Sequence, residues 1–303
     1  MAAPPAPRLF CFGLGFTARR LAESLRLDGW TVAGTSREAD KVAALAAAGI
    51  AAHRFDRDHP LDDARGALAG TTHLLVSAPP EDAGDVVLQL HEADIAAVET
   101  LEWIGYLSTT GVYGDHRGDW VDEASELRPL SPRALRRVAA EDAWLDVWHR
   151  YGLAVHLFRL AGIYGPGRSV FEQLAAGNAR RIDRPGQVFS RIHVDDIVAT
   201  LRASMARPDP GAIYNVCDDL PVAAAEVEAY ACELLGIEPP PLVPLEAAGL
   251  SPMAQSFYAD SRRVRNDKIK TALGVALSYP DYRQGLESVL ESRASVLNRR
   301  SRS

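Results

Sequence analysis

A loop with two closely spaced glycines near the start of the chain has the residues needed to hold a phosphate group. Gly13 and Gly15 follow the apolar run 8–12 (RLFCF) and precede a segment with helical spacing that begins with Phe16 and Thr17. Gly13 would permit a tight turn, and Gly15 would let a pyrophosphate approach the backbone, where the amides of the helix start attract negative charge. The order strand, Gly-x-Gly-x-x-Ala and helix therefore predicts a dinucleotide-binding loop.

The end of the next expected strand indicates which dinucleotide would bind. A residue that reads the ribose 2′-hydroxyl would be Asp or Glu here, but the run 34–37 (GTSR) contains neither. Ser36 and Arg37 instead offer a hydroxyl and a guanidinium, and a guanidinium forms paired hydrogen bonds to a 2′-phosphate. This favours NADP over NAD, with the alternative that Arg37 is only a solvated residue at a helix start.

Composition excludes several other classes of function. Apolar residues make up 47% of the 303 residues and charged residues 24%, which is ordinary for a globular chain. The formal net charge of −7 gives no reason to expect nucleic-acid binding. Cys11, Cys217 and Cys232 are sparse and lack a Cys-x-x-Cys spacing, so we expect no disulfide framework and no metal site.

Apolar strands alternate with helices through the first half of the chain. Strands are expected at 8–12, 30–35, 50–55, 73–77, 102–108 and 154–160, and helices at 16–28, 38–48, 82–98 and 131–151. Helices of this length between strands imply crossover connections and a parallel sheet, which binds its ligands at the carboxyl ends of the strands. We therefore predict an α/β fold with a doubly wound, Rossmann-type parallel sheet and a smaller C-terminal lobe on the substrate side.

The pattern also suggests domain limits. We expect an NAD(P)-binding domain of residues 8–165, completed by about 191–218. The substrate-side lobe would comprise 166–190 and 219–291, and the polar, basic tail 292–303 is expected to be disordered. The start of the chain lacks a signal-peptide pattern and no apolar stretch is long enough for a membrane span, so we expect a cytoplasmic protein without a membrane partner.

Three further segments resemble a known group of enzymes. The runs 107–114 (LSTTGVYG), 159–167 (RLAGIYGPG) and 192–197 (IHVDDI) are similar to motifs of extended short-chain dehydrogenases, the NAD(P)-dependent epimerases and dehydratases. The resemblance spans roughly residues 8–219 and implies a nucleotide cofactor together with a small-molecule substrate, such as a nucleotide-linked sugar. It also implies a monomer or a homodimer.

The resemblance assigns further residues to the site. In the family a Ser or Thr binds the substrate oxygen, a Tyr is the acid and base, and a Lys lowers the pKa of that Tyr and binds the nicotinamide ribose. Thr109 occupies the Ser/Thr position, and Asp56 stands where the family contacts adenine. Residues at other strand ends, expected to line the cofactor site, are Ala78, Pro79, Ser108 and Leu160.

The Tyr-x-x-x-Lys pair is missing from the sequence. The only lysines are Lys41, Lys268 and Lys270, and none follows a tyrosine by four residues. When the motif is counted back from Glu141, the Tyr position holds Arg133 and the Lys position holds Arg137. A guanidinium stays protonated and cannot act as a base, although Arg137 has the charge and donors to hold a ribose or phosphate.

Three functional hypotheses are considered, of which the third, a structural α/β protein with an empty cleft, is disfavoured by the Gly13–Gly15 loop. The first is an NADP-dependent oxidoreductase or epimerase in which Thr109 and Arg137 contribute to catalysis and Tyr113 is a candidate proton donor, although packing is the alternative for Tyr113. The second is an NADP(H)-binding sensor or regulatory protein without turnover. A group of arginines after the sixth expected strand either clasps a substrate diphosphate or forms a solvated loop; its members are Arg168, Arg180, Arg181, Arg184 and Arg191.

Overall fold

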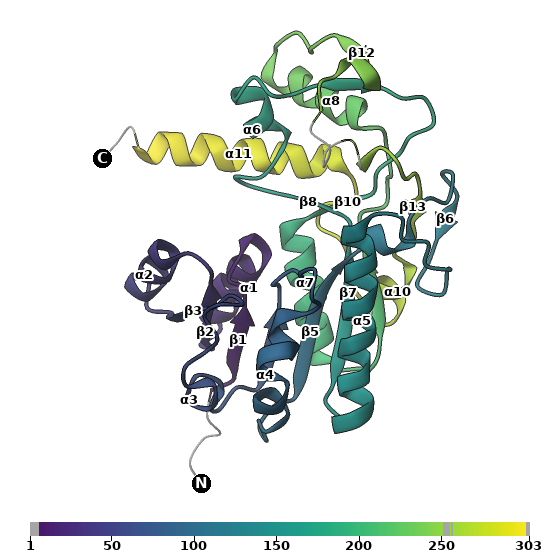
Figure 1. Cartoon of the computed structure of the whole chain (residues 1–303). Helices are drawn as coiled ribbons and strands as arrows, with labels where there is room; N and C mark the ends of the chain where they lie inside the picture. Colours follow the sequence, from purple (N-terminus) through teal and green to yellow (C-terminus); the bar gives the residue numbers. More distant parts are fainter. Residues whose placement is uncertain (1–5, 251–254, 256, 301–303) are drawn as a thin grey trace. The chain divides into compact units, whose positions relative to one another are not determined.

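The computed structural model describes residues 6–250, 255 and 257–300, and its largest element is a seven-stranded sheet. The strands follow the order β11-β7-β5-β4-β1-β2-β3, and the pairs from β3 to β5 are parallel. Figure 1 labels β7, β5, β1, β2 and β3 of this sheet. This confirms the predicted α/β class and the doubly wound sheet. The bounds of the strands are β1 (Arg8–Phe12), β2 (Thr31–Ser36), β3 (Ala51–Arg54), β4 (His73–Val76), β5 (Trp103–Thr109), β7 (Val155–Leu160) and β11 (Ile213–Val216).

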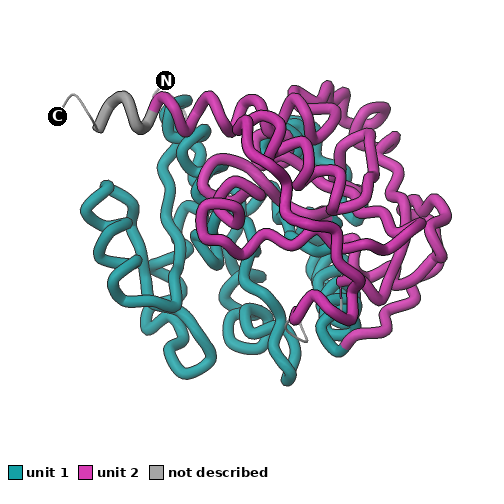
Figure 2. The backbone as a smooth tube through the Cα atoms, turned by 90° about the horizontal axis from the view of Figure 1, so that it is seen from above, with its two compact units in different colours: residues 1–109, 132–159, 198–214 teal, residues 110–131, 160–197, 215–303 magenta. Residues whose placement is uncertain are grey.

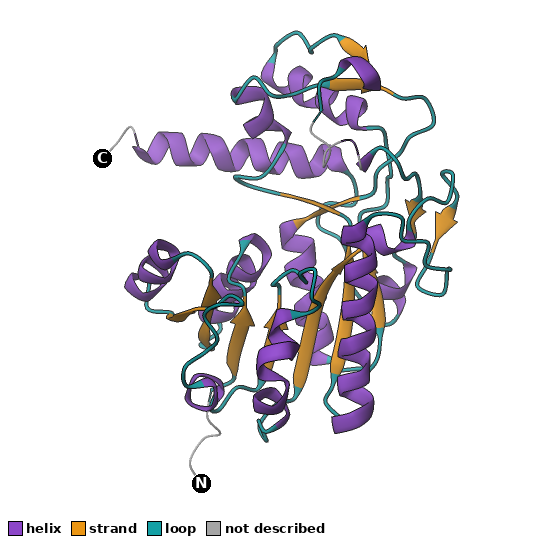
Figure 3. Ribbon diagram, viewed as in Figure 1, coloured by secondary structure: helices purple, strands orange, loops and turns teal. Residues whose placement is uncertain are grey.

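Helices connect these strands and cover both faces of the sheet (Figure 3). They are α1 (Phe16–Leu27), α2 (Ala39–Ala47), α3 (Ala64–Leu68), α4 (Val86–Ala96), α5 (Pro132–Tyr151) and α7 (Val194–Ala206). Helix α4 packs beside α5. Arg202 of α7 binds Ser24 and Asp28 at the end of α1, so these two helices also lie side by side.

The chain forms two compact units, which are coloured separately in Figure 2. Unit 1 comprises Met1–Thr109, Pro132–Arg159 and Val198–Tyr214. Unit 2 comprises Thr110–Ser131, Leu160–Ile197 and Asn215–Ser303. The segment 110–131, which the sequence suggested for the cofactor domain, is therefore grouped with the C-terminal part of the chain.

The core of unit 1 lies between the sheet and its helices. Phe10 and Phe12 of β1 are fully buried, as is Trp144 of α5, which packs in the same cluster. Strands buried on both faces consist of nearly continuous apolar residues, which is why β1 has the sequence RLFCF rather than an alternating pattern. This packing holds the carboxyl ends of the strands in place.

Unit 2 contains short strand pairs and helices around a second core of Phe171, Tyr282, Leu286 and Val289. The pairs are β8 with β10, β9 with β12 and β6 with β13. The elements are η1 (Thr110–Tyr113), β6 (Trp120–Val121), β8 (Gly162–Tyr164), α6 (Val170–Ala175), β9 (Arg181–Asp183), β10 (Arg191–His193), α8 (Ala224–Leu235), β12 (Leu242–Pro244), η2 (Leu245–Ala247), β13 (Arg263–Val264), α10 (Asp267–Thr271) and α11 (Tyr282–Arg300).

The C-terminal segment differs from our expectation. Residues 292–300 were expected to be disordered, but they continue helix α11, while 301–303 lie outside the described residues. The apolar side of α11 packs on α8, and Arg293 pairs with Glu172 of α6. Tertiary contacts therefore stabilise a helix whose sequence is polar. In the described part of the chain, no helix is both long and apolar enough to cross a membrane.

The order in which the chain adds strands to the sheet reverses between β1 and β4. From β1 the chain continues to β2 and β3 on one side, and then returns to β4 and β5 on the other. The connections that follow β1 and β4 therefore lead to opposite sides of the sheet, and in open α/β sheets this is the place where a ligand binds. The Gly13–Gly15 loop and the Ala78-Pro79 turn both follow strands at this position.

We predict that Gly34→Ala destabilises the protein by about 1–3 kcal/mol, because the interior has no room for the added carbon. A Cβ atom at Gly34 would lie 2.5 Å from the carbonyl oxygen of Cys11 and 2.9 Å from Cδ1 of Leu14. Denaturant unfolding measures the change. Gly162→Ala is the control, since its Cβ would come no closer than 3.4 Å to Ser190 and it should be nearly neutral. Equal effects of the two substitutions would contradict the packing argument.

Candidate functional site

The loop after β1 requires a glycine at its first position. Gly13 has a φ angle of +91°, in the region that side chains disfavour, and an added Cβ would lie 3.1 Å from the backbone nitrogen of Ala78. The Gly13 N–H donates to Thr35 Oγ1 at 2.9 Å, and the Leu14 N–H donates to the Thr35 carbonyl at 2.7 Å. Thr35, which the sequence analysis did not single out, therefore fastens this loop to β2.

The fold provides no comparable reason for a glycine at position 15, two residues later. Gly15 has φ −82° and ψ −163°, which other residues adopt readily, and an added Cβ would meet only Ser77 Oγ at 4.0 Å. Gly15 is the N-cap of α1 but provides no capping side chain, and the first turn of α1 contains no acidic residue. An open, electropositive helix start with a bare backbone fits an incoming phosphate group.

The first residues of α1 differ in exposure. Phe16 is partly exposed, whereas Thr17 is buried at 4%, so Thr17 would contribute its backbone rather than its hydroxyl to a ligand. On the neighbouring strand end, Arg37 is exposed and Ser36 Oγ accepts the N–H of Glu38 at 3.4 Å. Arg37 thus follows the carboxyl end of β2, the strand to which Thr35 bonds the loop after β1.

Asp56 lies after β3 in a small hydrogen-bonded turn. Its Oδ1 atom accepts hydrogen bonds from His59 Nδ1 at 2.6 Å and from the backbone N–H of Asp58 at 3.0 Å. The hydrogen bond with His59 lowers the pKa of Asp56. Ala78 and Pro79 follow β4, and the Ala78 N–H donates to the Phe12 carbonyl at 3.0 Å, which places this turn directly against the phosphate loop.

Two residues at the end of β5 are positioned by α5. Ser108 is buried, and its hydroxyl donates to the carboxylate of Glu141. Glu141 also forms a buried ion pair with Arg159 of β7, with Oε2 and Nη2 2.8 Å apart and side chains only 3% and 4% exposed. Thr109, the next residue, is partly exposed at the end of the strand.

The two positions expected for Tyr and Lys differ in their surroundings. Arg133 is exposed on the first turn of α5. Arg137 is 8% exposed, and its Nη1 atom donates to Tyr106 Oη and to the Leu107 carbonyl, each at 2.9 Å. Burial raises the pKa of Tyr106 despite the nearby guanidinium, so this phenol stays protonated. Arg137 therefore binds the strand beneath the site instead of projecting freely.

The two predicted residues in unit 2 are well packed. Tyr113 is fully buried in η1, and its hydroxyl donates to Asn215 Oδ1 at 2.7 Å. Leu160, at the end of β7, is 5% exposed. A phenol that is buried and already donates its proton to an amide is typical of a structural tyrosine, which was the alternative role for Tyr113.

Unit 2 also contains buried polar groups that the sequence analysis missed. Tyr164 Oη and Glu228 Oε2 lack hydrogen-bond partners among the described residues, and the buried Asp218 carboxylate interacts with the backbone of Arg191 and Leu220. Burial raises the pKa of Asp218 to about 8 and that of Glu228 to about 7. Arg191 interacts electrostatically with all three, and Arg181 with Glu228, so two members of the predicted arginine group come together here. A sequence pattern cannot reveal such a cluster, because its members come from separate elements.

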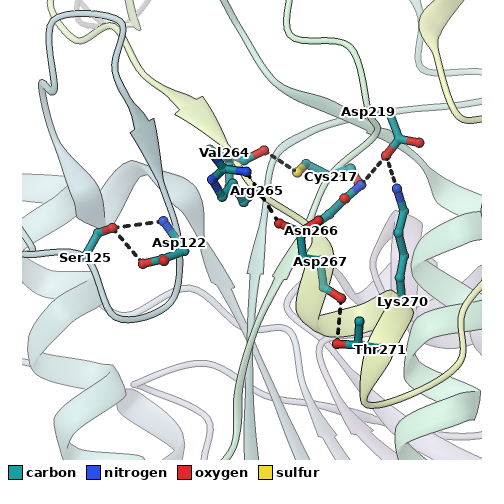
Figure 4. A network of polar contacts seen from close by, with 10 residues as sticks. All are labelled: Asp122, Ser125, Cys217, Asp219, Val264, Arg265, Asn266, Asp267, Lys270 and Thr271. Carbon is teal, nitrogen blue, oxygen red and sulfur yellow. Dashed lines mark hydrogen bonds and ion pairs between the residues drawn. The ribbon is translucent and has the colours of Figure 1, made fainter.

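A hollow of about 220 Å³ lies on unit 2 beside α10. In the network of Figure 4, Asp219 Oδ1 accepts hydrogen bonds from Asn266 Nδ2 at 2.6 Å and Lys270 Nζ at 2.5 Å. These bonds tie the end of β11 to α10, and Trp120 and Arg265 line the opposite side. Within the described ranges, no group of His, Cys, Asp and Glu side chains could hold a metal ion.

We predict that Asp218 makes the stability of the protein depend on pH. The pKa of Asp218 is raised from its usual value of 3.8 to about 8 in the folded state, so its contribution is fully present below about pH 4 and is lost as the pH rises through about 8. Each pH unit within this window should lower the free energy of unfolding by about 1.4 kcal/mol. Arg191, Tyr164 and Asp219 are the charged or titratable groups that act on Asp218.

Urea unfolding at several pH values measures this dependence. Asp218→Asn should show a shallower decline than the wild-type protein. Asp267→Asn, which alters a carboxylate that is 70% exposed, should keep the wild-type slope. If Asp218→Asn also kept that slope, Asp218 would not be the titrating group.

Comparison with known proteins agrees with this architecture. The model of the NAD dependent epimerase/dehydratase family matches residues 13–217. A conserved protein of unknown function from Silicibacter pomeroyi DSS has a similar structure, with a TM-score of 0.87 and 51% identity over 95% of this chain and 99% of that chain. Protein YeeZ of Escherichia coli K12 is 28% identical over 277 residues, which cover 89% of this chain and 95% of YeeZ.

A more distant structure shares the fold. The UDP-glucuronic acid 4-epimerase of Bacillus cereus, solved in complex with UDP-glucuronic acid and NAD, has a TM-score of 0.77 and 16% identity over 95% of this chain and 99% of that chain. The family match covers more than half of the sequence and includes the phosphate loop, β5 and the segment after β7. The chain belongs to the NAD dependent epimerase/dehydratase family.

Proposed function

We propose that the protein binds NADP(H) at the carboxyl ends of β1, β2 and β4 and acts as an oxidoreductase or epimerase on a small carbonyl compound or a nucleotide-linked sugar. The observation that carries the proposal is the open backbone at Gly15. The fold itself does not need a glycine there, since an added Cβ would have space around it. A ligand that must approach this backbone supplies the missing reason for the residue.

The neighbouring groups fit a dinucleotide phosphate. The backbone at the start of α1, from Gly15 through Phe16 and Thr17, faces no acidic side chain within its first turn. Ala78 and Pro79 form the adjoining wall. Asp56 is proposed to lie near the adenine, where its turn with His59 gives it a fixed position.

The preference for NADP rests on the end of β2. No carboxylate occurs between residues 34 and 37, and the exposed Arg37 supplies donors for a 2′-phosphate beside the Ser36 hydroxyl. NAD, which is bound by the Bacillus cereus epimerase, lacks that phosphate and would leave Arg37 without a ligand to bind. The distinction therefore depends on one side chain and can be tested directly.

The residue proposed to bind the reacting oxygen of the substrate lies at the end of β5. When bound, NADP(H) supplies the capacity to accept or donate a hydride. Thr109 is proposed to bind the substrate oxygen, because it is partly exposed while its neighbour Ser108 donates its hydroxyl to Glu141. Tyr113 is proposed to be structural, since its hydroxyl already donates to Asn215. The proton donor must then differ from the tyrosine that the family usually employs.

The state of α5 also supports a second candidate, an NADP(H)-binding sensor without turnover. The two positions that normally hold Tyr and Lys contain guanidinium groups, and neither can exchange a proton near neutral pH. To separate the two candidates, the purified protein can be incubated with NADP⁺ and a panel of UDP-sugars, and separately with NADPH and small aldehydes or ketones, with products followed by chromatography. Conversion of any substrate that is lost in Thr109→Val would exclude the sensor.

We predict that Gly15→Ser separates binding from folding. Serine is a better N-cap than glycine, so the free energy of unfolding should stay the same or rise by up to about 1 kcal/mol. The added side chain occupies the space needed by the phosphate, and we expect the Kd for NADPH to rise at least about tenfold. Fluorescence titration and denaturant unfolding give the two values. Unchanged NADPH binding would show that the phosphate does not approach Gly15.

We predict that Arg37→Ala reduces the preference for NADP. Loss of a charge-assisted pair of hydrogen bonds, worth about 1.5–3 kcal/mol, should weaken NADPH binding by about 10-fold to 100-fold and leave NADH binding nearly unchanged. Lys41→Ala, which removes a nearby exposed cation paired with Glu38, is the matched control and should alter neither affinity. An equal loss for both nucleotides in Arg37→Ala would assign Arg37 a general electrostatic role instead.

A further inference from the structure

Helix α5 is attached to the end of β5 at two consecutive residues. Arg137 donates to the carbonyl of Leu107 at 2.9 Å, and Glu141, one helical turn later, accepts the hydroxyl of Ser108. Residues four apart lie on the same face of a helix, so both groups reach the strand from one side. The residue that follows this double attachment is Thr109.

Arg137 and Glu141, the two side chains of α5 that bind β5, are themselves held in place by other buried residues. Arg137 Nη1 also donates to Tyr106 Oη, and the Tyr106 ring lies against the ring of Trp144 with centroids 6.0 Å apart. Trp144 Nε1 in turn donates to Asp85 at 3.2 Å, and Asp85 caps the first turn of α4. A buried series of hydrogen bonds and one aromatic ring contact thus connects the start of α4 with the end of β5.

The second of these side chains, Glu141, is fixed by charge. Glu141 and Arg159 form an ion pair inside unit 1, with three nitrogen–oxygen contacts of 2.8–3.2 Å. Removing one member of such a pair would leave the other charged and buried, which is strongly unfavourable. The Glu141 carboxylate therefore has one orientation, and Ser108 is held where that carboxylate accepts its hydroxyl.

We propose that Arg137 and Glu141 are positioning residues that fix the end of β5, so that Thr109 is preorganised toward the nicotinamide half of the cofactor. This rests on the proposed function. A guanidinium suits the task because Nη1 alone carries two N–H groups, which here donate to two oxygens, and because its charge does not vary with pH. The helix that carries the Tyr-Lys pair in relatives thus supports the strand end in this chain. Arg137, which the sequence suggested as a catalytic residue, acts through Leu107.

The test compares two ligands that share the adenosine half of the cofactor. NADPH extends to the end of β5 in the proposal, whereas 2′,5′-ADP lacks the nicotinamide half and needs only the phosphate loop and Arg37. Arg137→Met should raise the Kd for NADPH at least about tenfold and change that for 2′,5′-ADP less than about twofold. Arg137→Lys, which restores the charge on a shorter side chain, should recover part of the NADPH affinity. Arg136→Met alters an adjacent arginine that pairs with Asp82 and should change neither value.

Each result decides between the hypotheses. The positioning role is overturned if folded Arg137→Met binds both ligands more weakly to the same extent, or if it binds both as tightly as the wild-type protein. If the wild-type protein binds neither ligand, the proposed function fails, and the positioning role fails with it. If Arg137→Met does not fold, Ser108→Ala takes its place, because it leaves the Glu141–Arg159 pair intact and removes only the attachment to β5. Ser108→Ala should raise the Kd for NADPH by about threefold or more and leave the Kd for 2′,5′-ADP unchanged. Equal effects on the two Kd values would again overturn the proposal.

Discussion

The buried ion pair between Glu141 and Arg159 is the constraint on which the arrangement of unit 1 depends. It joins α5 to β7, and through Ser108 it also joins α5 to β5. Two charges in an apolar interior are tolerated only when their geometry satisfies both, so the pair admits a single register of the helix against the two strands. The ends of β5 and β7, where the family motifs lie, are positioned as a consequence.

Gly13 and Gly15, in the loop after β1, differ in the reason for which each position holds a glycine. Gly13 is required by the backbone, because its φ angle is positive and the turn after β4 passes close by. Gly15 is required by neither its φ angle nor its neighbours, since an added Cβ would come no closer than 4.0 Å to Ser77 Oγ. Gly13 therefore has a reason in the fold that Gly15 lacks, although the two glycines are equivalent in a sequence motif.

In unit 2 the polar groups are costly to bury. Asp218, Glu228 and Tyr164 come from three different elements and meet around Arg191, and burial holds the pKa values of all three above their usual range. A protein accepts such a cost where specificity or a defined cavity is needed. The same unit uses its carboxylates in other ways, since Asp196 of α7 accepts the backbone N–H groups of Ser278 and Tyr279.

The sequence by itself determined the class of fold, the approximate strand limits and the glycine turn between β1 and α1, because these depend on local apolar runs and on glycines at fixed spacing. Strand β1, for example, has the predicted limits of residues 8–12. Sequence reasoning also located Arg137 but could not tell that its guanidinium binds the Leu107 carbonyl. Nor could it show that residues 292–300 are helical or that Asp218 and Glu228 meet around Arg191. Only the tertiary structure decided these features, because each depends on desolvation and contacts between residues far apart in the chain.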